Sequence, residues 1–116
     1  MENLTIASFK EKVFDYEKSK DWTFKGSRPA IIDFYADWCG PCKALAPVLD
    51  SVSKDYAGKV DVYKVDTETQ GELAGLFGVR GIPAILFVPV NGEPSMASGF
   101  MPRESFDKAI GQLFGL

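Results

Sequence analysis

Apolar residues along this chain alternate between the three-to-four-residue repeat of amphipathic helices and the denser runs of buried strands. The pattern predicts helices over residues 8–16, 39–56 and 70–77 and a last helix from Pro102, and strands over residues 30–36, 59–66, 84–88 and 95–101. The run AIIDFYA, the first of these strands, is apolar on both alternating faces, which is typical of a central strand covered from both sides.

Glycine, proline and polar residues mark the breaks between these elements. Residues 19–29 are polar except for Trp22 and Phe24, so we expect a long loop there, with room for a short edge strand. Pro47 falls inside the second helix and should kink it, because proline removes one backbone hydrogen bond and crowds the preceding turn. The dipeptide Asn91-Gly92 suits a two-residue hairpin loop.

The order of the elements predicts a fold class. A β-α-β unit followed by a hairpin and a helix indicates an α/β domain whose sheet is mixed, parallel first and antiparallel later. No internal repeat or long linker divides the 116 residues, so one domain spanning 1–116 is expected.

Charge and hydropathy exclude several classes of function. The net charge of -3 and the scattered Lys and Arg residues argue against nucleic acid as a partner. No segment approaches the roughly 20 apolar residues of a membrane-spanning helix, so no membrane association is expected. The start MENLTIASFKEK lacks the features of a secretory signal, which favours the cytoplasm. A mature or recloned periplasmic form would look the same.

The sequence WCGPCK holds both cysteines of the chain, Cys39 and Cys42. It lies where the strand AIIDFYA gives way to a helix, and unpaired N–H groups at a helix N-terminus lower the pKa of a thiol. Cys39 at the lip of the helix can meet another molecule, whereas Cys42 points back toward the protein. Because residues at i and i+3 share a helix face, Cys42 can attack a mixed disulfide on Cys39. Pro41 suits the first helical turn and stiffens the ring.

Three other roles for the two cysteines are less well supported. A zinc site needs four ligands, and with no histidine or further cysteine it would require dimerisation or carboxylates. A c-type haem site needs a histidine at the position of Lys43. A purely structural disulfide closing so small a ring would gain only about 2 kcal/mol. A redox couple remains the favoured interpretation.

The string DFYADWCGPCKALAPVLD closely resembles the active-site segment of the thioredoxin family, and the likeness continues through KVDVYKVD, GVRGIPAILFV and NGE to the last helix. Only residues 19–29 lie clearly outside it. The resemblance implies a thioredoxin fold, a central mixed β-sheet flanked by helices on both faces. It also implies a monomeric protein-disulfide reductase that binds no cofactor, acts on disulfide-containing client proteins and is regenerated by a flavin- and NADPH-dependent reductase.

Asp33 is the one charged residue within AIIDFYA. Since neither face of that strand looks solvated, we expect a buried carboxyl with a raised pKa. The resemblance implies that Asp33 accepts the proton of Cys42 and that Lys64 modulates its titration. A solvated strand lysine remains the alternative for Lys64.

The resemblance further implies a flat apolar patch that receives client segments, formed by Trp38, Gly40, Pro41, Ile82, Pro83 and Gly99. Although most X–Pro bonds are trans, it predicts a cis bond at Ile82-Pro83, with the backbone of Ile82 offered to an extended peptide. Met96, Phe100 and Met101 are expected to pack in the core or within the hairpin.

Two other functions remain open on the same fold. One is a thiol oxidase or isomerase outside the cytoplasm, although oxidising relatives usually carry a histidine between the cysteines, where this chain has Gly40-Pro41. The other is a binding module without turnover. The sequence leaves the clients and the purpose of loop 19–29 undetermined.

Overall fold

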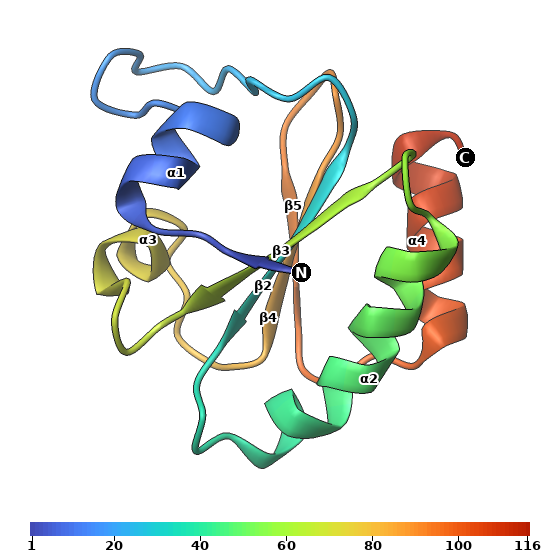
Figure 1. Cartoon of the computed structure of the whole chain (residues 1–116). Coiled ribbons are helices and arrows are strands. Elements are labelled where there is room, and N and C mark those ends of the chain that lie inside the picture. The colour runs from blue at the N-terminus through green and yellow to red at the C-terminus, as the bar shows by residue number, and fades with distance from the viewer.

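The computed structural model describes all 116 residues and contains one five-stranded sheet (Figure 1). Its strands are β1 (Glu2–Asn3), β2 (Ala30–Tyr35), β3 (Asp61–Asp66), β4 (Ala84–Val88) and β5 (Ser95–Ser98), in the spatial order β1-β3-β2-β4-β5. Strand β3 runs parallel to both β1 and β2, whereas β4 is antiparallel to β2 and β5 is antiparallel to β4. The predicted mixed sheet is therefore confirmed.

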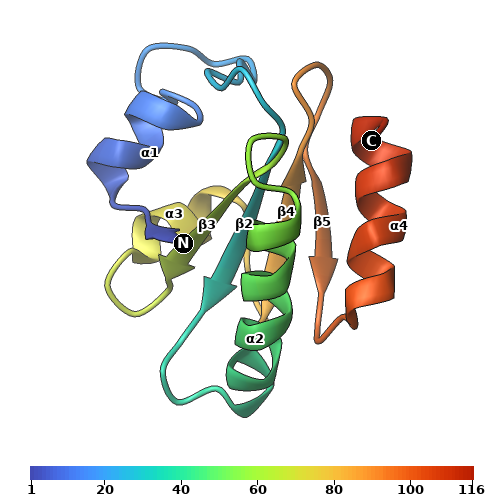
Figure 2. The same cartoon turned by 45° about the vertical axis from the view of Figure 1, so that its right-hand side comes forward.

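Helices cover both faces of the sheet, as predicted. They are α1 (Ile6–Lys12), α2 (Gly40–Asp55), α3 (Gly71–Leu76) and α4 (Arg103–Phe114). Figure 2 shows α1 and α3 on one side of the strands and α2 and α4 on the other. Helix α2 continues through Pro47 as a single element. None of the four helices combines the length and the apolar composition needed to cross a membrane.

Strand β2 separates two hydrophobic cores. Its residues Ile32 and Phe34 belong to the core beneath α1 and α3, and Ile31 belongs to the core beneath α2 and α4. All three side chains are fully buried. The expectation that both faces of this strand are dry is therefore confirmed, and Asp33, which shares a face with Ile31, is the one charged residue buried in the protein.

The hairpin between β4 and β5 differs from the prediction. Phe87 pairs with Ser95, so residues 89–94 connect the strands in place of a two-residue Asn91-Gly92 loop. Pro89 and Pro94 lack the N–H groups that would extend the ladder toward the turn. Gly92 has a φ of 97°, which suits the wider turn. The returning strand also stops at Ser98, short of the expected residue 101.

The N-terminal strand β1 was not predicted. Glu2 and Asn3 pair with Tyr63 and Lys64 of β3, and the N–H of Leu4 donates to the carbonyl of Lys64 at 2.8 Å. Two residues are too few to show a periodic pattern. The first helix is capped by Thr5, one of the two caps that the sequence offers, through a capping box with Ser8. It begins at Ile6, before the predicted residue 8, and ends at Lys12, short of the predicted residue 16.

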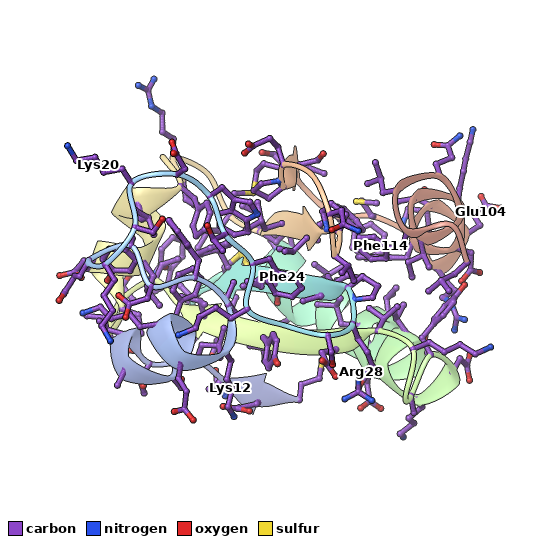
Figure 3. The ribbon with its side chains drawn as sticks, turned by 90° about the horizontal axis from the view of Figure 1, so that it is seen from above. Lys12, Lys20, Phe24, Arg28, Glu104 and Phe114 are labelled. Carbon is purple, nitrogen blue, oxygen red and sulfur yellow. A yellow bond between two sulfur atoms is a disulfide. The ribbon has the colours of Figure 1, made fainter.

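The loop after α1 contains no strand, contrary to the suggestion of an edge strand within residues 19–29. Trp22 and Phe24 instead pack against the core beneath α1. The ring of Trp22 lies 4.9 Å from that of Phe14, and Figure 3 shows Phe24 inside the curve of the loop while Lys20 projects away from it. The loop therefore closes one side of this core.

Replacing Trp22 with Ala is expected to lower the free energy of unfolding by about 2–4 kcal/mol, because it removes aromatic packing against Phe14 and Phe77. Trp22→Phe is the matched control. It retains a ring and removes an indole N–H that has no partner, so its cost should stay below about 1.5 kcal/mol. Urea unfolding followed by circular dichroism measures both values. A Trp22→Ala protein within about 0.5 kcal/mol of wild type would contradict a stabilising role for the loop.

Candidate redox site

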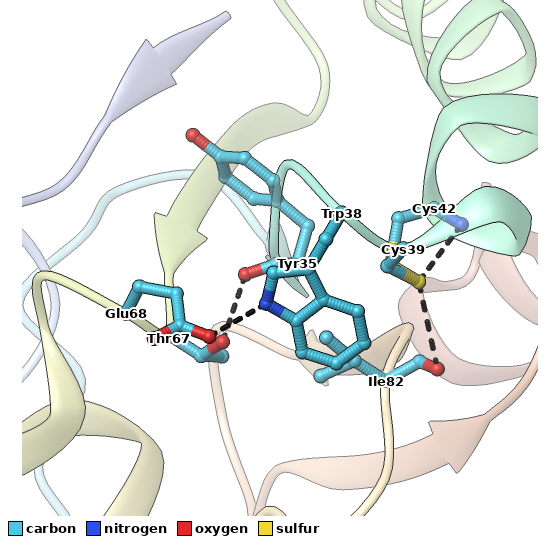
Figure 4. The surroundings of a disulfide bond; sticks show 7 residues. All are labelled: Tyr35, Trp38, Cys39, Cys42, Thr67, Glu68 and Ile82. Atoms are coloured by element: carbon cyan, nitrogen blue, oxygen red, sulfur yellow. Dashed lines mark hydrogen bonds between the residues drawn. A yellow bond between two sulfur atoms is a disulfide. The ribbon is translucent and has the colours of Figure 1, made fainter.

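The two cysteines lie where β2 leads into α2. Cys39 is the N-cap of the helix, and its sulfur accepts the backbone N–H of Cys42 at 3.2 Å. Pro41 occupies the first turn, where its missing N–H removes no helical hydrogen bond. The cysteines form a disulfide with their Cα atoms 5.2 Å apart (Figure 4). The predicted position of the pair at a helix N-terminus is therefore confirmed.

The predicted difference in accessibility between the cysteines is absent from this oxidised form. Cys39 is 4% exposed and Cys42 is 5% exposed. Together with Ala36 they form a small buried cluster, separate from the two main cores, against which Tyr35 and Ile82 pack. Sequence spacing did not reveal this cover, which comes partly from a distant loop. The two sulfurs differ in their hydrogen bonding, because the amide N–H of Cys42 reaches Cys39; in the reduced protein a donor at this place would favour the thiolate of Cys39.

The residues expected to form the client patch surround the disulfide to different degrees. Trp38 is 70% exposed, and its indole N–H donates to Glu68 Oε1 at 2.7 Å (Figure 4). Gly40 and Pro41 are also exposed, whereas Ile82 is half-buried. The carbonyl oxygen of Ile82 lies 3.8 Å from Cys39 Sγ.

Pro83 and Gly99 bring a second loop to the same place. The Ile82-Pro83 peptide bond is cis, as predicted, and Pro83 itself is buried. The N–H of Gly99 donates to the carbonyl of Pro83 at 2.8 Å, and the φ of 89° at Gly99 favours glycine. These contacts join the end of β5 to the residue beside the disulfide.

The three hydrophobic residues near β5 do not behave alike. Only Met101 packs against the core beneath α2 and α4, as predicted. Phe100 is 48% exposed and Met96 is 38% exposed, so neither is a core residue; Met96 lies opposite Leu86 in the β4–β5 hairpin. Both lie at or beyond an edge strand, where one face of each side chain has no neighbouring element. Phe100 directly follows Gly99 and therefore adds an aromatic side chain beside the patch.

Asp33 and Lys64 are paired across β2 and β3, so their side chains share a face of the sheet. Asp33 is 1% exposed, and burial raises the pKa of its carboxyl to about 6, while the positive charge of Lys64 opposes that rise. The ammonium of Lys64 lies 4.2 Å from the centre of the Tyr35 ring. Lys64 is half-buried and engaged by an aromatic ring, unlike a freely solvated strand lysine.

A cavity of about 280 Å³ connects the carboxyl of Asp33 with Cys42. It is lined by Asp33, Tyr35, Ala36, Asp37, Cys42, Lys43, Ala46 and Lys64. One oxygen of Asp33, Oδ1, has no hydrogen-bond partner in the protein. A cavity of this size with charged side chains in its wall can hold water, so a proton can pass between Cys42 and Asp33 without direct contact.

No set of three or more His, Cys, Asp or Glu side chains is grouped so that it could hold a metal ion. The groups that the site brings together are the two cysteine sulfurs, joined as a disulfide, one carboxyl of raised pKa and one nearby ammonium.

Asp33→Asn should flatten part of the dependence of stability on pH. The folded protein holds the Asp33 proton more tightly than the unfolded chain, so wild type loses stability as pH rises from 4 to above 6. A pKa increase from 3.8 to about 6 corresponds to roughly 3 kcal/mol. We therefore expect the stability of oxidised wild type, relative to Asp33→Asn, to fall by about this amount between pH 3 and pH 8. Urea unfolding at each pH measures the difference, and parallel profiles would contradict it.

Comparisons with known proteins agree with this geometry. Residues 3–112 match the protein-family model described as Thioredoxin. The thioredoxin of Borreliella burgdorferi is 48% identical over 113 residues, which is 97% of each chain. The thioredoxin of Synechocystis sp. is 38% identical over 104 residues, covering 90% of this chain and 88% of that protein.

A solved structure extends the likeness to the whole fold. Chloroplastic thioredoxin z matches with a TM-score of 0.82 and 25% identity, over 97% of this chain and 93% of that one. The match covers nearly the whole chain and therefore includes the mixed sheet with helices on both faces. The chain belongs to the thioredoxin family of disulfide oxidoreductases, with Cys39 and Cys42 as its redox-active pair.

Proposed function

We propose that the chain is a general reductant of protein disulfides in which Cys39 attacks the client, Cys42 resolves the intermediate and Asp33 accepts the proton of Cys42. The observation that carries this proposal is the position of Cys39 as N-cap of α2, with its sulfur receiving the N–H of Cys42. That N–H and the helix dipole favour the thiolate on Cys39 over the thiolate on Cys42.

In the first step, the Cys39 thiolate attacks one sulfur of a client disulfide. A bond forms between Cys39 and that sulfur, the client S–S bond breaks, and the departing client thiolate takes a proton from water. The chain and the client are then joined by a mixed disulfide. Cys42 is still a thiol at this stage and lies one helical turn away.

In the second step, Cys42 loses its proton and attacks Cys39. Asp33 can receive this proton through the shared cavity, because its carboxyl has a pKa of about 6 and an oxygen without a protein partner. The Cys39–Cys42 bond forms, the mixed disulfide breaks, and the second client sulfur leaves as a thiolate that is then protonated. Two electrons have passed from the dithiol to the client.

Client segments are proposed to bind on the patch of Trp38, Gly40, Pro41, Ile82, Pro83 and Gly99, extended by Phe100. The strong exposure of Trp38 and Phe100 supports this role. A client strand that paired with the backbone of Ile82 would lie beside Cys39, because the Ile82 carbonyl is 3.8 Å from that sulfur.

The reducing direction is proposed from the residues between the cysteines. Gly40 and Pro41 carry no ionisable group, so the thiolate of the reduced form gains no neighbouring positive charge from them. By likeness to relatives, we propose regeneration by an NADPH-dependent flavoprotein reductase. A monomer in the cytoplasm fits a reductant, since that compartment is kept reducing. A periplasmic form would need an external supply of electrons.

Cys42→Ser is expected to accumulate a mixed disulfide with an oxidised client such as insulin, because a serine hydroxyl cannot attack the bond on Cys39. The matched variant Cys39→Ser should accumulate little. Non-reducing electrophoresis, followed by mass spectrometry of the bridged peptides, measures both. Equal trapping by the two variants would assign the nucleophile differently.

The redox potential distinguishes a reductant from an oxidase or isomerase. We expect equilibration of the Cys39–Cys42 pair with glutathione buffers to give a value near that of thioredoxins in general, about -270 mV. A potential above about -200 mV, in the range of isomerases, would contradict the reducing role. Insulin reduction with dithiothreitol, compared between wild type and Cys39→Ser, checks that the site turns over.

A further inference from the structure

Three residues from three strands form a row across one face of the sheet. Lys64 of β3 is the register partner of Asn3 on β1 and of Asp33 on β2. Tyr35 lies two residues beyond Asp33 on the same face. Asn3, Asp33 and Tyr35, all from other strands, are therefore neighbours of Lys64 on this face.

Tyr35 contacts its neighbours through both its ring and its hydroxyl. The ring centre lies 4.2 Å from Lys64 Nζ, and the hydroxyl donates to Asn3 Oδ1 at 2.8 Å. The Tyr35 carbonyl accepts both the N–H and the hydroxyl of Thr67, at 2.9 and 3.0 Å (Figure 4). The ring points away from the disulfide (Figure 4). Tyr35 is thus fixed at its backbone and at its tip, and it presents the face of its ring to the ammonium.

We propose that Tyr35 is a positioning residue whose ring, anchored by Asn3, holds the Lys64 ammonium in the wall of the cavity beside Asp33. This inference rests on the proposed role of Asp33 in the second step, which depends on the charge that the carboxyl meets. Tyr35 packs against the small cysteine cluster, but its ring points away from the disulfide (Figure 4), and Asn3 contacts the hydroxyl of that ring. Their effect passes through Lys64.

Without a partner, the ammonium of Lys64 would not stay beside Asp33. The lysine side chain has four flexible bonds, and water competes strongly for the ammonium. An aromatic face attracts the cation without neutralising it, so the full positive charge remains available to act on Asp33. A carboxylate in place of the ring would instead cancel much of that charge. An aromatic residue at position 35 therefore positions the Lys64 ammonium and leaves its effect on the pKa of Asp33 intact.

Other groups around Asp33 provide little competing charge. On the cavity wall, α2 contributes Cys42 and Lys43, the β2–α2 turn contributes Asp37, and β3 contributes Lys64. On the remaining side, the register partner from β4 is the apolar Ile85. Lys64 is the one charge with a resolved effect on the pKa of Asp33, and it acts to lower that pKa. Displacement of Lys64 should therefore raise the pKa of Asp33.

The experiment measures the pKa of Asp33 by carbon-13 NMR of its carboxyl in the oxidised protein, where neither cysteine titrates. Lys64→Met sets the scale and should raise this pKa by about one unit or more. Tyr35→Leu should raise it by at least about half as much, because the released ammonium spends most of its time in water. An unchanged or lowered pKa in Tyr35→Leu would overturn the proposal.

Entry of water into the cavity would change the pKa of Asp33 in the opposite direction, which provides a control. If Tyr35→Leu acted by admitting water to the cavity, the carboxylate would be better solvated and the pKa of Asp33 would fall. In a Lys64→Met background, Tyr35→Leu should therefore give no further rise. An equal rise with and without Lys64 would show that Tyr35 acts by another route, and the proposal would be wrong.

The contribution of Asn3 is tested by two variants that remove the same hydrogen bond. Tyr35→Phe and Asn3→Ala should each raise the pKa of Asp33 by a similar amount, smaller than that of Tyr35→Leu, because the ring remains but is no longer held at its tip. An unchanged pKa in both variants would contradict the anchoring role of Asn3.

A kinetic measurement separates this inference from the proposed function. The second step is followed by stopped-flow tryptophan fluorescence in wild type, Tyr35→Leu and Asp33→Asn across pH 5–9. We expect the pH profile of Tyr35→Leu to shift upward with the NMR value and Asp33→Asn to slow the step about tenfold or more. If Asp33→Asn resolves as fast as wild type, the proposed proton acceptor is wrong even where the NMR shifts hold.

Discussion

Burial of β2 on both faces is the constraint on which the rest of the structure depends. A strand with Ile32 and Phe34 on one side and Ile31 on the other requires cover from two layers of helices. The same burial forces Asp33 into a dry environment, where its carboxyl keeps a proton at a pH at which most carboxyls are ionised. When the strand ends, the chain turns directly into α2. One buried strand thus places both the acid and the sulfurs.

Much of the fold follows from local pattern. Residues 84–88 were predicted as a strand and form one, and both faces of residues 30–35 are dry as their composition indicates. The hairpin register did not follow, because it depends on where prolines interrupt the ladder as well as on the turn signal Asn91-Gly92. Strand β1 could not be found either, since its two residues are held only by pairing with β3.

The reactive groups of the site could be predicted from the sequence, but the burial and exposure of the residues around them could be predicted less well. The position of Cys39 at a helix start and the burial of Asp33 follow from neighbours in sequence. The cover over Cys39 depends on Ile82, which is distant in sequence, and the exposure of Phe100 depends on the absence of a neighbour beyond β5. The contact between Lys64 and Tyr35 depends on the register of β2 and β3. A hydrophobic pattern shows which face of a strand a residue lies on, but not which residue of the next strand it pairs with.

The small cluster of Ala36, Cys39 and Cys42 stands apart from both large cores. Making or breaking the bond between its two sulfurs therefore need disturb only a few short side chains, while the aromatic and aliphatic residues beneath the helices keep their neighbours. A protein built in this way can be reduced and oxidised repeatedly while its fold stays the same. The reduced and oxidised forms would then present nearly the same surface to donor and acceptor proteins. The main difference between the two forms would be the oxidation state of the cysteine pair.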